Sequence, residues 1–150
     1  MSGMLTSFEA LFNTDLDRLK TELESYESDA QLWKIEGTIG NSGGTLIVHL
    51  CGNLQHFFGA VMGGSDYQRD RDGEFSKKDV SKSELLEEIE KSRQAVKNGL
   101  QALSEDMLES NFPLEVFGHP MTYGYFLIRL QGHLNYHLGQ INYHRRLIKG

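Results

Sequence analysis

Along most of this chain, apolar residues recur in alternating steps of three and four, the spacing of residues on one face of an α-helix. Four stretches keep this pattern long enough to form a helix of several turns. The first is predicted to run over about residues 7–26, and its apolar positions are Leu5, Phe8, Phe12, Leu16, Leu19, Leu23 and Tyr26. Four amphipathic helices with one short and two longer connections predict an all-α four-helix bundle.

Residues that favour helix ends separate the four stretches. The second helix is predicted to begin after an N-cap at Asn41 or Ser42 and to end at Gly63-Gly64. The third begins at Ser81, which forms a capping box with Glu84 three residues later. Thr122 is expected to cap the fourth helix, which continues almost to the end of the sequence.

The connections between these helices differ in character. The charged stretch SDYQRDRDGEFSKKDV (residues 65–80) lacks apolar periodicity, so it is predicted to be a solvated connection with no element of its own. A short turn at SEDMLES is expected to extend the third helix. The stretch NFPLEVFGHPMT (residues 111–122) surrounds a brief alternating run with prolines and a glycine, which predicts an irregular loop or a small hairpin.

Length and charge narrow the class of protein. A chain of 150 residues has a typical single-domain length, and one domain over residues 1–150 is expected. The net charge is −6 and no basic cluster is longer than Arg145-Arg146, so no nucleic acid or membrane partner is expected. Cys51 stands alone, which excludes an internal disulfide, and it is interpreted as a buried structural thiol. No stretch has the pattern of a signal peptide or a membrane span, which favours a cytoplasmic location.

Histidines form a stripe on the fourth predicted helix. In GHLNYHLGQINYH (residues 132–144), His133, His137, Gln140 and His144 fall within roughly 60° of arc on a helical projection. His49 lies at the border of the apolar face of the second helix. Imidazoles four residues apart can share a metal ion, and a third from a facing helix completes three coordination positions. Half-buried histidines with ordinary hydrogen bonds have the same spacing, so both interpretations stay open.

Two segments resemble the metal-binding signatures of the DinB/YfiT-like superfamily. TLIVHLCGN contains the first histidine followed by leucine, and HLNYHLGQINYHRRL contains the pattern His-x-x-x-His-x-Gly-Gln. The resemblance spans nearly the whole chain. The segment RDRDGEF is similar to a subgroup of this superfamily whose function is not established.

This resemblance implies an up-down-down-up bundle in which His49, His133 and His137 bind a divalent metal: zinc, nickel, iron or manganese. It also implies frequent homodimers. Some relatives are thiol-dependent transferases that use a low-molecular-weight thiol such as bacillithiol or mycothiol, and others have no known activity.

The remaining polar residues near the stripes have weaker assignments. Asn53 and Gln140 are candidates for hydrogen bonds to a ligand histidine or to a substrate. His144 and His56 each lie seven residues beyond a predicted ligand, about 10 Å along a helix, which is too far for the same metal ion. His144 is therefore interpreted as a surface or interface residue, and His119 as an exposed loop residue.

Other metal-dependent classes lack their defining residues. A ferritin-like site needs Glu-x-x-His pairs, but Leu130 and Leu134 stand three residues before the two histidines. The metalloprotease motif His-Glu-x-x-His is absent. A calcium loop beginning at Gln68 would have Asp79 in its twelfth position in place of glutamate.

Two classes of function remain. In the first, the metal activates a thiol or water toward a small electrophile, as in a thiol S-transferase. In the second, the protein is a non-catalytic metal-binding or small-molecule-binding module. In both cases we expect a homodimer, because Tyr136 and Tyr143 lie on the flank of the fourth helix opposite its apolar stripe.

Overall fold

The computed structural model describes residues 3–149 and is all-α, with no strand in that range. The long α-helices are α1 (Met4–Ser25), α3 (Gly43–Leu54), α5 (Lys82–Gln101) and α6 (Tyr123–Leu147). The π-helix η1 (Gln55–Met62) continues α3. The short helices are α2 (Asp29–Trp33), α4 (Arg71–Ser76) and the 3-10 helix η2 (Glu105–Glu109). Within the described residues, no helix combines the length and the apolar character needed to cross a membrane.

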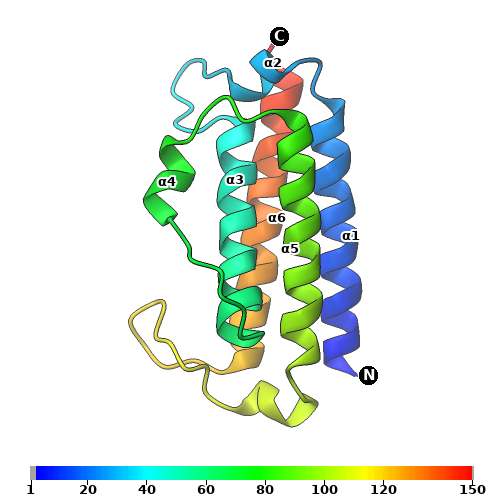
Figure 1. The fold of residues 1–150 in the computed structure, drawn as a ribbon, viewed down its shortest axis with the longest axis vertical. Helices are drawn as coiled ribbons and strands as arrows, with labels where there is room; N and C mark the ends of the chain where they lie inside the picture. The colour runs from blue at the N-terminus through cyan, green and yellow to red at the C-terminus, as the bar shows by residue number, and fades with distance from the viewer. Residues whose placement is uncertain (1–2, 150) are drawn as a thin grey trace.

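The four long helical columns stand side by side, as Figure 1 shows, with α3 and η1 forming one column. α1 contacts both α5 and α6, and α3 contacts the same two helices. α4 lies outside the columns and contacts α3. This arrangement places α3 beside α6, the two helices that carry the predicted metal ligands.

The predicted apolar faces form the core. The apolar positions named above for the first helix are all buried, and those of α6 that face inward are Leu127, Leu130, Leu134, Leu138 and Ile141. Phe12 of α1 meets Phe58 of η1 edge to face, with ring centroids 5.0 Å apart. Burial of these faces is the main stabilising contribution that the helices receive from one another.

The predicted caps are confirmed where the structure tests them. The Ser42 hydroxyl accepts a hydrogen bond from the backbone N–H of Thr45 and begins α3. Ser81 and Glu84 form the capping box of α5. The Thr122 hydroxyl caps α6. Each of these helix starts follows from local hydrogen bonding and needs no tertiary contact.

The π-helix η1 was not predicted from the sequence. It carries Phe57 and Phe58, which are both buried, and it lies close against the second half of α5. Gly99 permits that approach, because a Cβ there would lie 2.6 Å from the carbonyl oxygen of Phe58. A substituted residue at this position would separate η1 from α5.

The connections between the long helices contain short helices that the sequence analysis did not predict. The stretch 65–80 contains α4, which begins at an N-cap made by Asp70, so it is not a mere solvated connection. The stretch after Tyr26 contains α2, whose N-cap is Ser28. Residues 111–122 form an irregular loop closed by one isolated antiparallel bridge between Asn111 and Thr122, and SEDMLES contains the separate helix η2.

The interpretation of His144 as a surface or interface residue is wrong, because its side chain is buried between helices. The Tyr26 hydroxyl lies 2.7 Å from its Nδ1, and its Nε2 lies 2.8 Å from the carbonyl oxygen of Lys34. A carbonyl only accepts, so Nε2 of His144 donates to Lys34, and the Tyr26 hydroxyl also donates to the carbonyl oxygen of Ile141 at 3.2 Å. Burial raises the pKa of Tyr26 far above its usual range, so the hydroxyl keeps the proton that it donates.

We expect His144→Ala to destabilise the fold by about 2–4 kcal/mol, because it leaves a cavity in the buried region and removes one hydrogen-bond partner each from the Tyr26 hydroxyl and the Lys34 carbonyl. The melting temperature should fall on the order of 10 °C, measured by circular dichroism. His119→Ala is the control: His119 lies exposed in the loop, as predicted, and its loss should change stability by no more than about 0.5 kcal/mol. Equal melting temperatures for both variants would contradict a structural role for His144.

Candidate metal centre

Three histidines from two helices meet at the contact between α3 and α6. His49 lies on α3, and His133 and His137 lie one turn apart on α6. One ring nitrogen of each lies within 4.8 Å of the other two. The Nε2 atoms of His49 and His133 are 3.0 Å apart, close to the separation of about 3.3 Å for two nitrogens on one tetrahedral zinc ion. These three residues, which were the predicted ligands, could therefore hold a metal ion.

Glu74 fixes the orientation of His49. Its Oε1 lies 3.0 Å from Nδ1 of His49, and both side chains are buried. Burial raises the pKa of Glu74, but hydrogen bonds from His49 and Arg69 outweigh it, so the pKa of the carboxyl is lowered overall. A carboxylate only accepts, so Nδ1 of His49 carries the proton. The lone pair of Nε2 then points toward His133.

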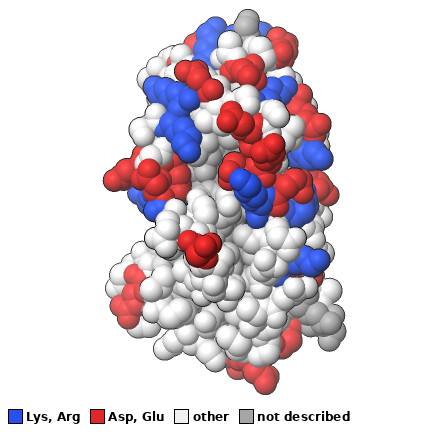
Figure 2. Space-filling model, viewed as in Figure 1, with Lys and Arg blue, Asp and Glu red and all other residues white. Residues whose placement is uncertain are grey.

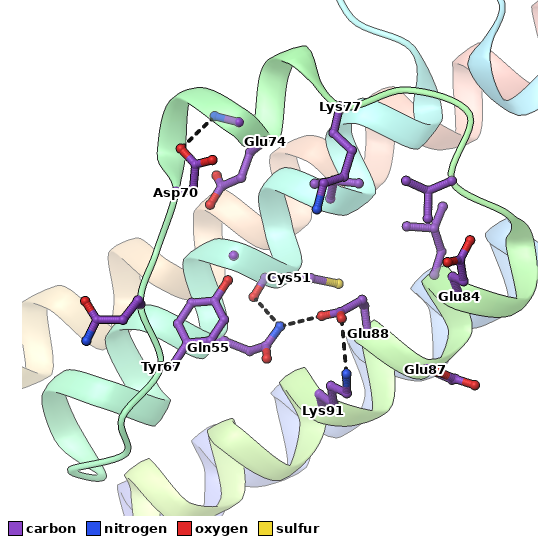
Figure 3. Close-up of a pocket in the computed structure, with 16 residues that line it drawn as sticks. Cys51, Gln55, Tyr67, Asp70, Glu74, Lys77, Glu84, Glu87, Glu88 and Lys91 are labelled. Carbon is purple, nitrogen blue, oxygen red and sulfur yellow. Dashed lines mark hydrogen bonds and ion pairs between the residues drawn. The ribbon is translucent and has the colours of Figure 1, made fainter.

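Arg69 holds the other side of the carboxylate. Its Nε donates to Oε2 of Glu74 at 2.9 Å and its Nη2 donates to Oε1 at 3.1 Å. Figure 3 shows Glu74 extending from α4 toward α3. Gly52 of α3 leaves the space for it, because a Cβ at that position would overlap the carboxylate. An arginine, a carboxylate and a histidine thus form one chain of hydrogen bonds that ends at the three-histidine cluster.

Sequence reasoning missed Arg69 and Glu74, although both lie in the segment RDRDGEF. Two signals could have found them. Asp70 stands three residues before Gly73, whose N–H it accepts, and this is the spacing of an N-cap that starts a helix. Gly52 stands inside a predicted helix three residues after His49, and a glycine there indicates that another group approaches closely.

Gln140 orients the third histidine of the cluster. Its Oε1 lies 2.7 Å from Nδ1 of His137. An amide oxygen only accepts, so Nδ1 of His137 carries the proton and Nε2 is free to bind a metal. Two of the three histidines are therefore held in the tautomer that metal binding at Nε2 requires.

The environment of the cluster favours neutral imidazoles. Burial lowers the pKa of His133 to about 4, and the charges of His137 and His49 lower it further. Burial also lowers the pKa of His137, although the hydrogen bond with Gln140 opposes this. Metal ions bind neutral imidazole, so these two histidines are in the binding form at neutral pH.

Two buried polar atoms at the cluster have no protein partner within residues 3–149: Nδ1 of His133 and Oδ1 of Asn53. Asn53 follows His49 by one turn of α3. Buried polar atoms nearly always have partners, and exceptions call for a ligand, ion or water. The three imidazoles fit a bound metal ion, and Oδ1 of Asn53 fits a further ligand that donates a hydrogen bond.

The cysteine of the chain lies outside the three-histidine cluster. Cys51 is buried, as predicted, and burial raises the pKa of its thiol to about 12. Cys51 lines a hollow of about 690 Å³, which lies between α3, α4 and α5 (Figure 3). Gln55 lines that hollow and donates to Glu88 at 2.9 Å.

Figure 2 shows the face of the molecule that is turned to the viewer in Figure 1. Charged side chains of both signs gather over its upper half, while its lower half carries few.

These features define a class of helical protein in which three histidines from two helices could hold a metal ion. The chain belongs to the family described as "Protein of unknown function (DUF1572)", whose model matches residues 5–150. Comparisons with curated proteins and with solved structures give no match.

We expect Glu74→Gln to weaken zinc or nickel binding by about 10- to 100-fold, because a neutral amide orients His49 less firmly and lowers its basicity. Titration calorimetry would measure the affinity, and circular dichroism would show that the variant folds. Asp72→Asn is the matched control, since Asp72 is an exposed acid on the same short helix. Equal affinities for Glu74→Gln and Asp72→Asn would contradict the role assigned to Glu74.

Proposed function

We propose that this protein is a DinB/YfiT-like four-helix bundle that binds a divalent metal through His49, His133 and His137. The course of the chain in Figure 1 supports the up-down-down-up topology. α1 rises from the N-terminus, α3 and α5 descend, and α6 rises to the C-terminus. The spacing of the histidines in the sequence supports the same superfamily.

One observation carries the metal assignment: the Nε2 atoms of His49 and His133 face each other at 3.0 Å while Glu74 holds the opposite nitrogen of His49. A metal-binding histidine commonly donates its other N–H to a carboxylate in this way. Imidazole ligands suit zinc, nickel and iron, and manganese is the fourth candidate. Three protein ligands leave a coordination position for water or substrate.

The chemistry that we propose is transfer of a low-molecular-weight thiol to a small electrophile. A divalent cation bound by three neutral imidazoles would supply Lewis acidity that lowers the pKa of a thiol or of water. The sulfur then forms a bond to the electrophilic carbon, the bond from that carbon to its leaving group breaks, and the thiol proton passes to solvent. Asn53 accepts a hydrogen bond from the incoming reactant, and Gln140 keeps His137 oriented.

Purified protein should bind one divalent ion per chain, measured by elemental analysis. At a thousandfold excess over its Kd, the metal adds about 4 kcal/mol of stability, which raises the melting temperature on the order of 10 °C. His133→Ala should lose most of this gain, whereas His56→Ala should keep it, because His56 lies outside the cluster. A melting temperature that does not change with chelator, zinc or nickel would contradict the metal assignment.

The transfer reaction is tested with metal-loaded protein, chlorodinitrobenzene and a series of low-molecular-weight thiols. We expect a carbon–sulfur bond to replace the carbon–chlorine bond faster than in buffer, followed by absorbance, and His133→Ala to return the rate to background. If the protein binds metal but does not accelerate the reaction of any of these thiols, it is a non-catalytic metal-binding module, which is the alternative function.

We also propose a homodimer through the outer face of α6. Tyr136, Tyr143 and Leu147 are 66%, 63% and 65% exposed there, and a symmetric pair is the commonest way to cover such a face. Light scattering at micromolar concentration should give twice the chain mass, and Tyr143→Glu should reduce it. Leu11→Glu, at an exposed apolar position of α1, is the control. A monomer mass with and without metal would refute the dimer.

A further inference from the structure

A pocket of about 800 Å³ opens beside the three histidines. Its inner end, at the candidate metal centre, is lined by His49, His133 and Asn53. The remaining wall comes from η1, from residues 69 and 71 at the start of α4, from the loop before α6 and from the first half of α6. Most of that wall is apolar; its apolar members are Phe57, Val116, Phe117, Phe126, Ile128 and Leu130. Both the volume and the apolar wall are typical of sites for small organic molecules.

The charged residues of this pocket are all basic. Arg69, Arg71 and Arg129 line it, and within residues 3–149 no aspartate or glutamate does, although the chain carries a net charge of −6. Glu74 neutralises Arg69. Arg71 and Arg129 form no ion pair with any carboxylate of the described residues. The pocket therefore has a local excess of positive charge, which favours an anionic ligand.

Aromatic rings support both unpaired arginines. The guanidinium of Arg129 lies 4.6 Å from the ring centroid of Phe117, and that of Arg71 lies 5.7 Å from the ring centroid of Phe75. Stacking restrains a guanidinium without using its N–H groups, because these point outward in the guanidinium plane. The fork of donors that matches a carboxylate remains free on each arginine.

The inner end of the pocket contains an acceptor with no protein donor. Asn53 lines the pocket, is 7% exposed, and has a buried Oδ1 without a partner in the described chain. This observation is independent of the arginines. It points to a ligand that brings an O–H or N–H group to the end of the pocket beside His49.

We propose that the pocket binds a small carboxylic acid with an aromatic or branched aliphatic body and a hydrogen-bond donor at its far end. The carboxylate pairs with Arg71 and Arg129, the body lies against the phenylalanines, and the donor reaches Asn53. This inference rests on the proposed function in one respect: it makes this acid the electrophilic substrate, whose electrophilic carbon and leaving group would lie beside the donor, at the end next to the candidate metal ligands.

The test compares hydrocinnamate with hydrocinnamamide, which has the same body and no charge. Titration calorimetry uses the full chain both as purified and after metal removal, because a bound metal could itself hold a carboxylate. We expect the acid to bind about tenfold or more tightly than the amide in both states. In the double variant Arg71→Gln, Arg129→Gln this preference should fall to about twofold or less.

Arg146→Gln is the matched control. Arg146 is another exposed arginine of α6, it stacks on Tyr143 with 5.4 Å between its guanidinium and the ring centroid, and it does not line the pocket. This variant should keep the full preference for the acid. Circular dichroism shows whether each variant folds, and the single variants Arg71→Gln and Arg129→Gln, each with an intermediate preference, support the assignment if the double variant unfolds.

Asn53 is tested with phloretate, which adds a phenolic hydroxyl to hydrocinnamate. Phloretate should bind more tightly than hydrocinnamate to the wild type, and the gain should disappear in Asn53→Leu while the preference for acid over amide remains. If phloretate still binds more tightly than hydrocinnamate to Asn53→Leu, Asn53 does not accept the hydrogen bond of the ligand.

Equal binding of hydrocinnamate and hydrocinnamamide, or a preference that appears only with metal and survives in the double arginine variant, would overturn the proposal. The comparison on metal-free protein keeps this failure separate from a failure of the metal site. If the protein prefers the acid to the amide but binds no metal, only the proposed metal chemistry is contradicted. If it binds metal but shows no preference for the acid, only the proposal of a carboxylic acid ligand is contradicted.

Discussion

The Glu74 residue is 5% exposed, and a carboxylate charge that is buried to this degree is stable only when it is paired and hydrogen-bonded. Arg69 and His49 meet that requirement from opposite sides. Their contacts hold α4 against α3, set the tautomer of His49, one of the three candidate metal ligands, and keep Arg69 in the wall of the pocket. The position of the segment 65–80 and the geometry of the candidate metal centre therefore depend on one buried ion.

The parts of the fold that depend on local rules could be predicted from the sequence. Apolar periodicity identified the buried faces of the long helices, and the caps at Ser42, Ser81 and Thr122 follow from hydrogen bonds within four residues. The short helix α4 could not be predicted in this way, because six residues without an apolar stripe form a helix only when tertiary contacts stabilise it. The π-helix η1 likewise reflects close contact with α5, which periodicity does not encode.

The same distinction applies to the site. The spacing of His133 and His137 along one helix and the border position of His49 are local facts, and the structure brings these residues together. A helical projection gives the direction of a side chain but not what lies opposite. His144 was assigned to the surface or to an interface because it lies too far along the helix to share the metal ion, but Tyr26 and the backbone of Lys34 cover it. The projection also gave no sign of Glu74, whose partner is 25 residues away in the sequence.

Gly52 has a consequence for how this site can change during evolution. The space that the Glu74 carboxylate occupies against α3 exists only because this position has no side chain. Any other residue at 52 and the buried acid at 74 exclude each other, so the two positions are expected to vary together among related sequences. A chain that replaces the glycine must also find a new orienting group for the histidine at 49, or lose firm control of one of its three ligands.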